Sequence, residues 1–146
     1  MGDIPAGPNG PVPHLTVPTR GTTMAIAALK MLTLDSSDAQ RDATFWSALL
    51  GWEVAHAQAE YAMLTGPGGM ALGFGTLDDH AAPGWPNEHG SKQFHLDLAV
   101  DDLDAAAAEC VELGATLPDE QPGETWRVLL DPSGHPFCLT QAANWG

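Results

Sequence analysis

One pattern of segments occurs twice along the chain, and it constrains the fold more than any other feature. Each copy has an apolar segment, a short acidic segment, a helical segment that ends at a glycine, and further apolar segments separated by a glycine-containing turn. Leu50-Gly51-Trp52 aligns with Leu113-Gly114-Ala115, and residues 67–74 align with 132–139. A unit that cannot bury its own sheet face must pack against its copy. The repeat therefore predicts an α+β domain in which two βαβββ modules form curled mixed sheets around a shared cleft.

Hydrophobic periodicity divides the single domain expected at 24–146 into modules at 24–77 and 93–146, with a connector at 78–92. Apolar runs predict strands at 26–34, 52–56, 61–65 and 70–74, and again at 93–100, 115–117, 126–130 and 136–140. Helical spacing predicts helices at 39–50 and from the cap at Asp101-Asp102 to Leu113. Trp46, at helical spacing on the first helix, is expected in the core.

Residues 1–23 are rich in proline and glycine, which predicts a disordered tail and makes Met24 a candidate native start. The two cysteines, Cys110 and Cys138, are too few for a disulfide framework, and no CxxC motif is present. No apolar run approaches the roughly 20 residues of a membrane helix, and no signal peptide is recognisable. A cytoplasmic location is expected.

The charge of the chain is strongly acidic, with 19 Asp and Glu against 5 Lys and Arg and a net charge of −14. Binding to nucleic acid or to an anionic membrane needs clustered basic residues, so neither partner is expected. A small-molecule ligand is expected instead, and the negative charge favours a cationic one. The alternative is that the acidic surface only maintains solubility.

Three segments of the repeat have a characteristic order and spacing. They are Phe45-Trp46-Ser47-Ala48-Leu49-Leu50-Gly51-Trp52-Glu53-Val54, Phe94-His95-Leu96-Asp97-Leu98-Ala99-Val100-Asp101-Asp102 and Asp131-Pro132-Ser133-Gly134-His135-Pro136-Phe137. In these segments the sequence resembles the vicinal oxygen chelate superfamily of glyoxalases, bleomycin-resistance proteins and dioxygenases, and most of all its actinobacterial glyoxalase-like subgroup. The resemblance covers residues 29–140. It implies paired βαβββ modules around a cleft, and a homodimer.

In the metal enzymes that this sequence resembles, His or Glu/Gln side chains on the first and fourth strands of each module hold a divalent ion. Aligned on the helix-ending glycines, these positions are Leu32, Gly73, His95 and Cys138. Leucine and glycine offer no side-chain donor. One histidine with one cysteine makes an incomplete site, although a cysteine suits a soft metal. The expectation is therefore no metal site and no cofactor, with a divalent metal as the alternative.

Alternation along a strand places His95 and Asp97 on one face. A carboxylate beside an imidazole orients the ring for acid–base catalysis, and a polar lining role for His95 is the alternative. Cys138 is either a nucleophile or a small buried residue. Trp85 and Trp126 either stack on a flat or cationic ligand or pack at the surface. The expected ligand-binding residues are Leu32, Gly73, Trp85, His95, Asp97, Trp126 and Cys138, with His95 and Asp97 as catalytic candidates, whereas His80 and His89 are expected to be solvated.

Two functions follow from these residues. The first is a metal-independent small-molecule-binding protein that sequesters a cationic or aromatic ligand, similar to the drug-sequestering members of the superfamily. The second is a lyase, isomerase or cyclase in which His95 and Asp97 are the acid–base groups, with or without a divalent metal. Whether the chain is an enzyme is left open by its sequence.

Overall fold

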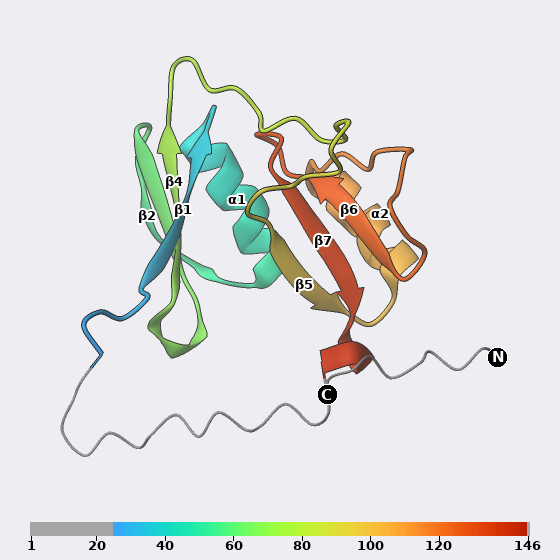
Figure 1. Cartoon of the computed structure of the whole chain (residues 1–146). Coiled ribbons are helices and arrows are strands. Elements are labelled where there is room, and N and C mark those ends of the chain that lie inside the picture. Colours follow the sequence, from blue (N-terminus) through green and yellow to red (C-terminus); the bar gives the residue numbers. More distant parts are fainter. Residues whose placement is uncertain (1–24, 146) are drawn as a thin grey trace.

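The computed structural model describes residues 25–145, so the predicted tail and the candidate start at Met24 lie outside the described residues. The first module contains β1 (Met31–Ser36), α1 (Ala39–Leu50), β2 (Glu53–Ala57), β3 (Tyr61–Thr65) and β4 (Ala71–Thr76). The second contains β5 (Leu96–Val100), α2 (Leu103–Leu113), β6 (Trp126–Leu130) and β7 (Pro136–Gln141). The predicted α+β architecture of two mixed sheets is confirmed (Figure 1).

The strands form two separate sheets that lie side by side. The first has the order β1-β4-β3-β2, with one parallel and two antiparallel pairs, and the second has the order β5-β7-β6, with one parallel and one antiparallel pair. β1 and β5 are edge strands, and they are the neighbouring edges of the two sheets in Figure 1. The sheets are therefore open along this line rather than joined into one.

Both helices begin and end as their sequences predict. The side chain of Asp38 accepts a hydrogen bond from the amide of Arg41 at the start of α1, and Asp102 does the same for Ala105 at the start of α2. Gly51 ends α1 with φ of 70°, a left-handed conformation that glycine adopts without strain. No helix among residues 25–145 is both long and apolar enough to span a bilayer.

Two predicted strands are shorter at their N-terminal ends than expected. β1 begins at Met31 because its pairing with β4 begins there, and Ile26 and Leu29 before it are exposed. β5 begins at Leu96, where pairing with β7 begins, and Phe94 is 93% exposed. Both strands were predicted to begin earlier because the preceding residues are apolar, but those residues have no partner strand.

The strand predicted at 115–117 is wrong, because only one isolated bridge forms there, between Thr116 and Leu130. The side chain of Gln121 takes the place of a fourth strand. Its amide nitrogen donates to the Val128 carbonyl at 2.9 Å, and its oxygen accepts from the Val128 amide at 2.8 Å. The second sheet therefore has three strands.

An aromatic cluster in the core joins the two modules. Trp46, which is 1% exposed as predicted, packs edge-on against Phe137 of β7 with ring centroids 5.0 Å apart. Phe45 contacts both rings, at 5.4 Å and 6.0 Å. α1 thus packs against its own sheet and also against the second module. This packing sets the position of β1 relative to β5.

Candidate functional site

The register of β5 against β7 brings three chemically distinct side chains together. Asp97 lies directly opposite Cys138 in the parallel pair, and His95, which comes just before β5 begins, contacts Asp97 with its side chain. The donor atoms of His95, Asp97 and Cys138 lie within 4.8 Å of one another. We call these three residues the β5–β7 cluster. It places both catalytic candidates from the sequence beside a thiol.

The β5–β7 cluster is open to solvent on one side. His95 Nε2 lies 3.4 Å from Asp97 Oδ1, and the two side chains are 30% and 42% exposed, whereas Cys138 is 3% exposed. Burial raises the pKa of the Cys138 thiol to about 11, the charge of Asp97 adds to this, and Lys92 opposes it. Cys138 is therefore a thiol rather than a thiolate at neutral pH, which makes it a weak nucleophile.

The residue of the first module that corresponds to His95 is Met31, and the predicted correspondence with Leu32 is wrong. Met31 precedes the helix cap Asp38 by as many residues as His95 precedes the cap Asp102. The error arises because α1 has 12 residues and α2 has 11, so an alignment on the helix-ending glycines is shifted by one at the strand. Leu32 instead packs against the core.

Strand pairing supports the corrected correspondence. Thr33 lies opposite Gly73 just as Asp97 lies opposite Cys138. A Cβ atom built at Gly73 would lie 3.1 Å from Met31 Sδ, Thr33 Oγ1 and Tyr61 Oη. A side chain at this position would be crowded, and neither Gly73 nor Met31 offers a nitrogen or oxygen donor, so the residues present do not fit the two-module metal centre that the resemblance implies.

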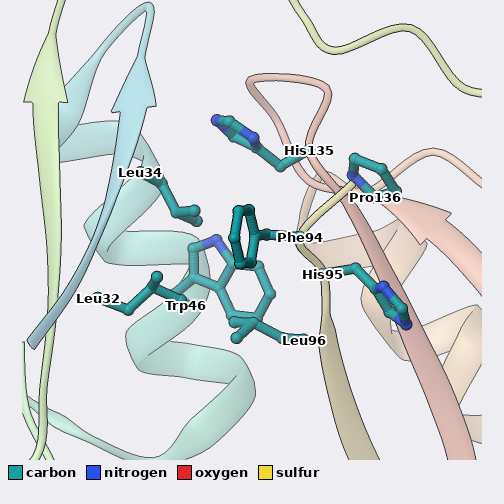
Figure 2. Close-up of a pocket in the computed structure, with 8 residues that line it drawn as sticks. All are labelled: Leu32, Leu34, Trp46, Phe94, His95, Leu96, His135 and Pro136. Atoms are coloured by element: carbon teal, nitrogen blue, oxygen red, sulfur yellow. The ribbon is translucent and has the colours of Figure 1, made fainter. Parts of the chain in front are cut away.

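A small cavity lies between β1 and β5, and we call it the seam cavity. Its volume is about 90 Å³. Figure 2 shows the apolar side chains of both modules converging on it, whereas the ring of His95 points away from them. The lining residues are Leu32, Leu34, Trp46, Phe94, His95, Leu96, His135 and Pro136.

The seam cavity continues into a more polar one of about 280 Å³, and the two share Leu32, Leu34, Phe94 and His135. The larger cavity adds Thr33, Asp35 and Lys92, among others, to the lining. The exposed ring of Phe94 borders both. A ligand in this groove would contact leucines and an aromatic ring at one end and a carboxylate, a hydroxyl and an amine at the other.

The two predicted tryptophans lie in different surroundings. Trp85 is half-buried in the connector, where Lys92 Nζ lies 4.5 Å from its ring centroid, and its buried Nε1 has no hydrogen-bond partner among residues 25–145. Trp126 lies opposite Thr140 in the β6–β7 pair, with its ring against Gly123. Neither lines the seam cavity.

Sequence reasoning missed two residues near the site. The sequence analysis gives His135 no role in the site, yet its Nε2 lies 2.5 Å from the Asp35 carbonyl oxygen of the other module, and it lines both cavities. Trp145 donates from its indole to Thr140 Oγ1 at 2.7 Å. A polar side chain between Gly134 and Pro136 is the sequence feature that could have indicated His135. No comparable feature indicates Trp145.

The histidines of the connector differ from each other. His89 is solvated as predicted, with a side chain 78% exposed. His80 is half-buried, and its Nε2 lies 2.9 Å from the Ser133 carbonyl oxygen, so the prediction that it is solvated is wrong. It connects the start of the connector to the β6–β7 turn.

A buried polar network holds that turn against the first module. Asp42, fully buried in α1, accepts hydrogen bonds from Ser36, Ser133 and Arg41. Asp131 accepts from Trp46 Nε1 at 3.0 Å and from two backbone amides of its own turn. Burial raises the pKa of Asp131, and these hydrogen bonds act against that effect. The network fixes the edge of the seam cavity.

Comparison with known proteins gives a family and a fold. Residues 31–140 match the model of the glyoxalase-like domain. A glyoxalase/bleomycin resistance protein/dioxygenase family enzyme from Burkholderia phytofirmans matches with a TM-score of 0.60 and 19% identity, over 80% of this chain and 99% of that one. The trypanothione-dependent glyoxalase I of Leishmania major matches with a TM-score of 0.57 and 16% identity, over 82% and 89%. A comparison with curated proteins found no match.

Proposed function

Because the chain belongs to the glyoxalase-like domain family, whose members include both enzymes and binding proteins, we propose that it binds a small aromatic cation in the seam cavity. The observation that carries this proposal is the lining of the cavity, in which Leu32, Leu34 and Leu96 surround the space beside the exposed ring of Phe94. Apolar walls with a few polar groups are typical of ligand pockets.

The charge of the chain supports a cationic ligand. A net charge of −14 raises the local concentration of cations. Asp35 lines the groove that continues from the seam cavity, and Asp97 lines a third cavity that shares Leu32 and Leu96 with it. An aromatic face such as that of Phe94 attracts a cation by about 0.5–1 kcal/mol at an exposed site.

Binding in this proposal needs no metal ion of the family's two-module type. The crowding around Gly73 and the apolar character of Met31 support this part of the proposal. The homodimer and the cytoplasmic location implied by the resemblance and the composition belong to the same proposal, and gel filtration with light scattering tests the dimer.

Isothermal titration calorimetry with matched ligands tests binding. The panel contains one aromatic ring system in cationic, neutral and anionic forms, and the cationic form should bind most tightly. Phe94→Ala should weaken its binding about 2- to 12-fold, since a lost aromatic contact costs roughly 0.5–1.5 kcal/mol. Val54→Ala, a truncation of an exposed apolar residue on β2, serves as the matched control and should bind normally. Equal affinity of Phe94→Ala and the parent chain would refute the proposed site.

The 3.4 Å approach of His95 to Asp97 favours a second function, an acid–base lyase, isomerase or cyclase. In that reaction His95 would remove a proton from a ligand bound against the β5–β7 cluster, and Asp97 would orient the ring. Solvent-deuterium exchange into carbonyl ligands, followed by NMR, should then be lost in His95→Gln and slowed in Asp97→Asn. Exchange that persists in His95→Gln would exclude His95 as the base.

A further inference from the structure

We infer that the ligand of the seam cavity is a zwitterion of the aromatic α-amino acid class, whose ammonium group pairs with Asp35 and whose carboxylate pairs with Lys92. The inference rests on the proposed function, because it keeps an aromatic cation in the seam cavity and adds a carboxylate to that ligand. Asp35 and Lys92 both line the polar groove that continues from the cavity. They supply one negative and one positive charge to the same space.

The apolar end of the groove suits the ring of such a ligand. Leucine side chains from β1 and β5 converge there, and the exposed ring of Phe94 borders the same space (Figure 2). The seam cavity has a volume of about 90 Å³, which leaves room for no more than one ring. Charged groups are disfavoured against apolar walls, so the ammonium and the carboxylate must lie in the adjoining groove of about 280 Å³.

The two charges that line the groove are not paired with each other. Among residues 25–145 neither Asp35 nor Lys92 makes an ion pair, so the carboxylate and the amine are more than 4.0 Å apart. His135 Nε2 lies against the backbone carbonyl oxygen of Asp35, and this contact leaves the carboxylate available. A ligand that carries both charges can therefore lie between the two side chains and pair with each.

The ring of Trp85 holds the amine of Lys92 in position without neutralising its charge. Lys92 Nζ lies 4.5 Å from the centroid of this ring, which is within the range of a cation–π contact. Lys92 is also half-buried, so water and salt screen its charge less than that of an exposed lysine. A positioned amine loses less conformational entropy when it binds, which favours pairing with a ligand carboxylate.

The backbone between Lys92 and Phe94 is strained at the wall of the groove. Gln93 has a φ of 59°, in the left-handed region, and no other non-glycine residue among residues 25–145 has a positive φ. Such conformations cost free energy and cluster at ligand-binding sites. Gln93 lines the groove together with both of its neighbours. The strain at Gln93 therefore supports a binding role for this wall.

The order of residues on each wall matches a compact ligand. On β1 the apolar Leu34 is followed directly by Asp35, and before β5 begins Lys92 is two residues from Phe94. Each wall therefore places one charge beside an apolar contact. In an aromatic α-amino acid a single carbon separates the ring from the carbon that carries both charged groups. The ligand thus has the same close arrangement of ring and charges as the groove.

Calorimetry of the full chain with three derivatives of one amino acid tests the inference. Phenylalanine has both charges, phenylalaninamide keeps only the ammonium, and N-acetylphenylalanine keeps only the carboxylate. Phenylalanine should bind roughly 2- to 5-fold more tightly than phenylalaninamide, as expected for a partly exposed ion pair. Lys92→Met should abolish this difference, and Lys92→Arg should preserve it. Lys30→Met removes an exposed lysine that lines none of the cavities described, and this matched control should bind like the parent chain.

Asp35→Asn should weaken phenylalanine and phenylalaninamide by the same factor, because both carry the ammonium group. Circular dichroism of each variant establishes that it is folded. Two results would overturn the inference and leave the proposed function standing: equal affinity of the parent chain for phenylalanine and phenylalaninamide, or a preference for phenylalanine that persists in Lys92→Met. Absence of binding by every aromatic cation would instead remove the proposed function, and the inference with it.

Discussion

At the scale of single residues, the buried carboxylate of Asp131 gives a direct prediction. Its two oxygens accept from Trp46 Nε1 and from the amides of Ser133 and His135. Asp131→Asn keeps one acceptor but turns the other position into a donor that faces the indole N–H. We expect the free energy of unfolding to fall by about 1–3 kcal/mol, the cost of a buried unpaired polar group. Urea denaturation measures this, and Asp101→Asn, an exposed substitution, should change stability by less than about 0.5 kcal/mol. Equal stability of the two variants would contradict the prediction.

Individual site residues were predictable where strand alternation alone decides their placement. His95 and Asp97 contact each other for this reason, and Leu72 and Phe74, two residues apart on β4, are both buried. The correspondence of Leu32 with His95 failed because a single extra residue in α1 shifted the alignment, and one residue along a strand reverses the face. Contacts between modules, such as that of His135 with Asp35, depend on tertiary packing and have no local signal.

At the scale of elements, the open edge of β6 depends on one side chain. Gln121 satisfies both backbone groups of Val128, a fully buried residue, as a neighbouring strand would. Gln121→Ala should therefore lower the free energy of unfolding by about 1–3 kcal/mol and accelerate hydrogen exchange of the Val128 amide. Glu120→Ala, an exposed change at the adjacent position, is the control and should leave that amide protected. Unchanged exchange at Val128 in Gln121→Ala would mean that another group protects it.

Elements were most predictable where apolar periodicity and a partner strand coincide. β3 and β6 have the predicted bounds, and the helices end where glycine allows it. The predicted strand at 115–117 failed because alternation cannot distinguish a strand from a segment whose neighbour is replaced by a glutamine side chain. The first strand of each module was predicted to begin too early for a related reason. Apolar residues such as Phe94 lie exposed beside a cavity and have no partner strand.

At the scale of the whole molecule, the two modules should unfold as one unit. Trp46 of α1 is buried against Phe137 of β7, and Ser133 of the β6–β7 turn donates to the buried Asp42 of α1. Each module therefore completes the core of the other. Ser133→Ala removes one of these connections, and we expect the free energy of unfolding to fall by about 1–3 kcal/mol, because the hydrogen bond is buried and its acceptor is charged.

The loss of stability in Ser133→Ala should be distributed over both modules, since the hydrogen bond joins them. Hydrogen exchange should accelerate in α1 and in β7 by the same factor, while urea unfolding remains a single transition. Ser91→Ala, an exposed serine of the connector, removes the same hydroxyl at a position without such a bond and should behave like the parent chain. If exchange accelerated only in the β6–β7 turn, the modules would be independently stable, and the seam cavity between them would lie between two units free to move apart. Faster exchange in both α1 and β7 would instead mean that one cooperative core holds the walls of the cavity in place. Binding of a small ligand is favoured by such a rigid, pre-formed cavity.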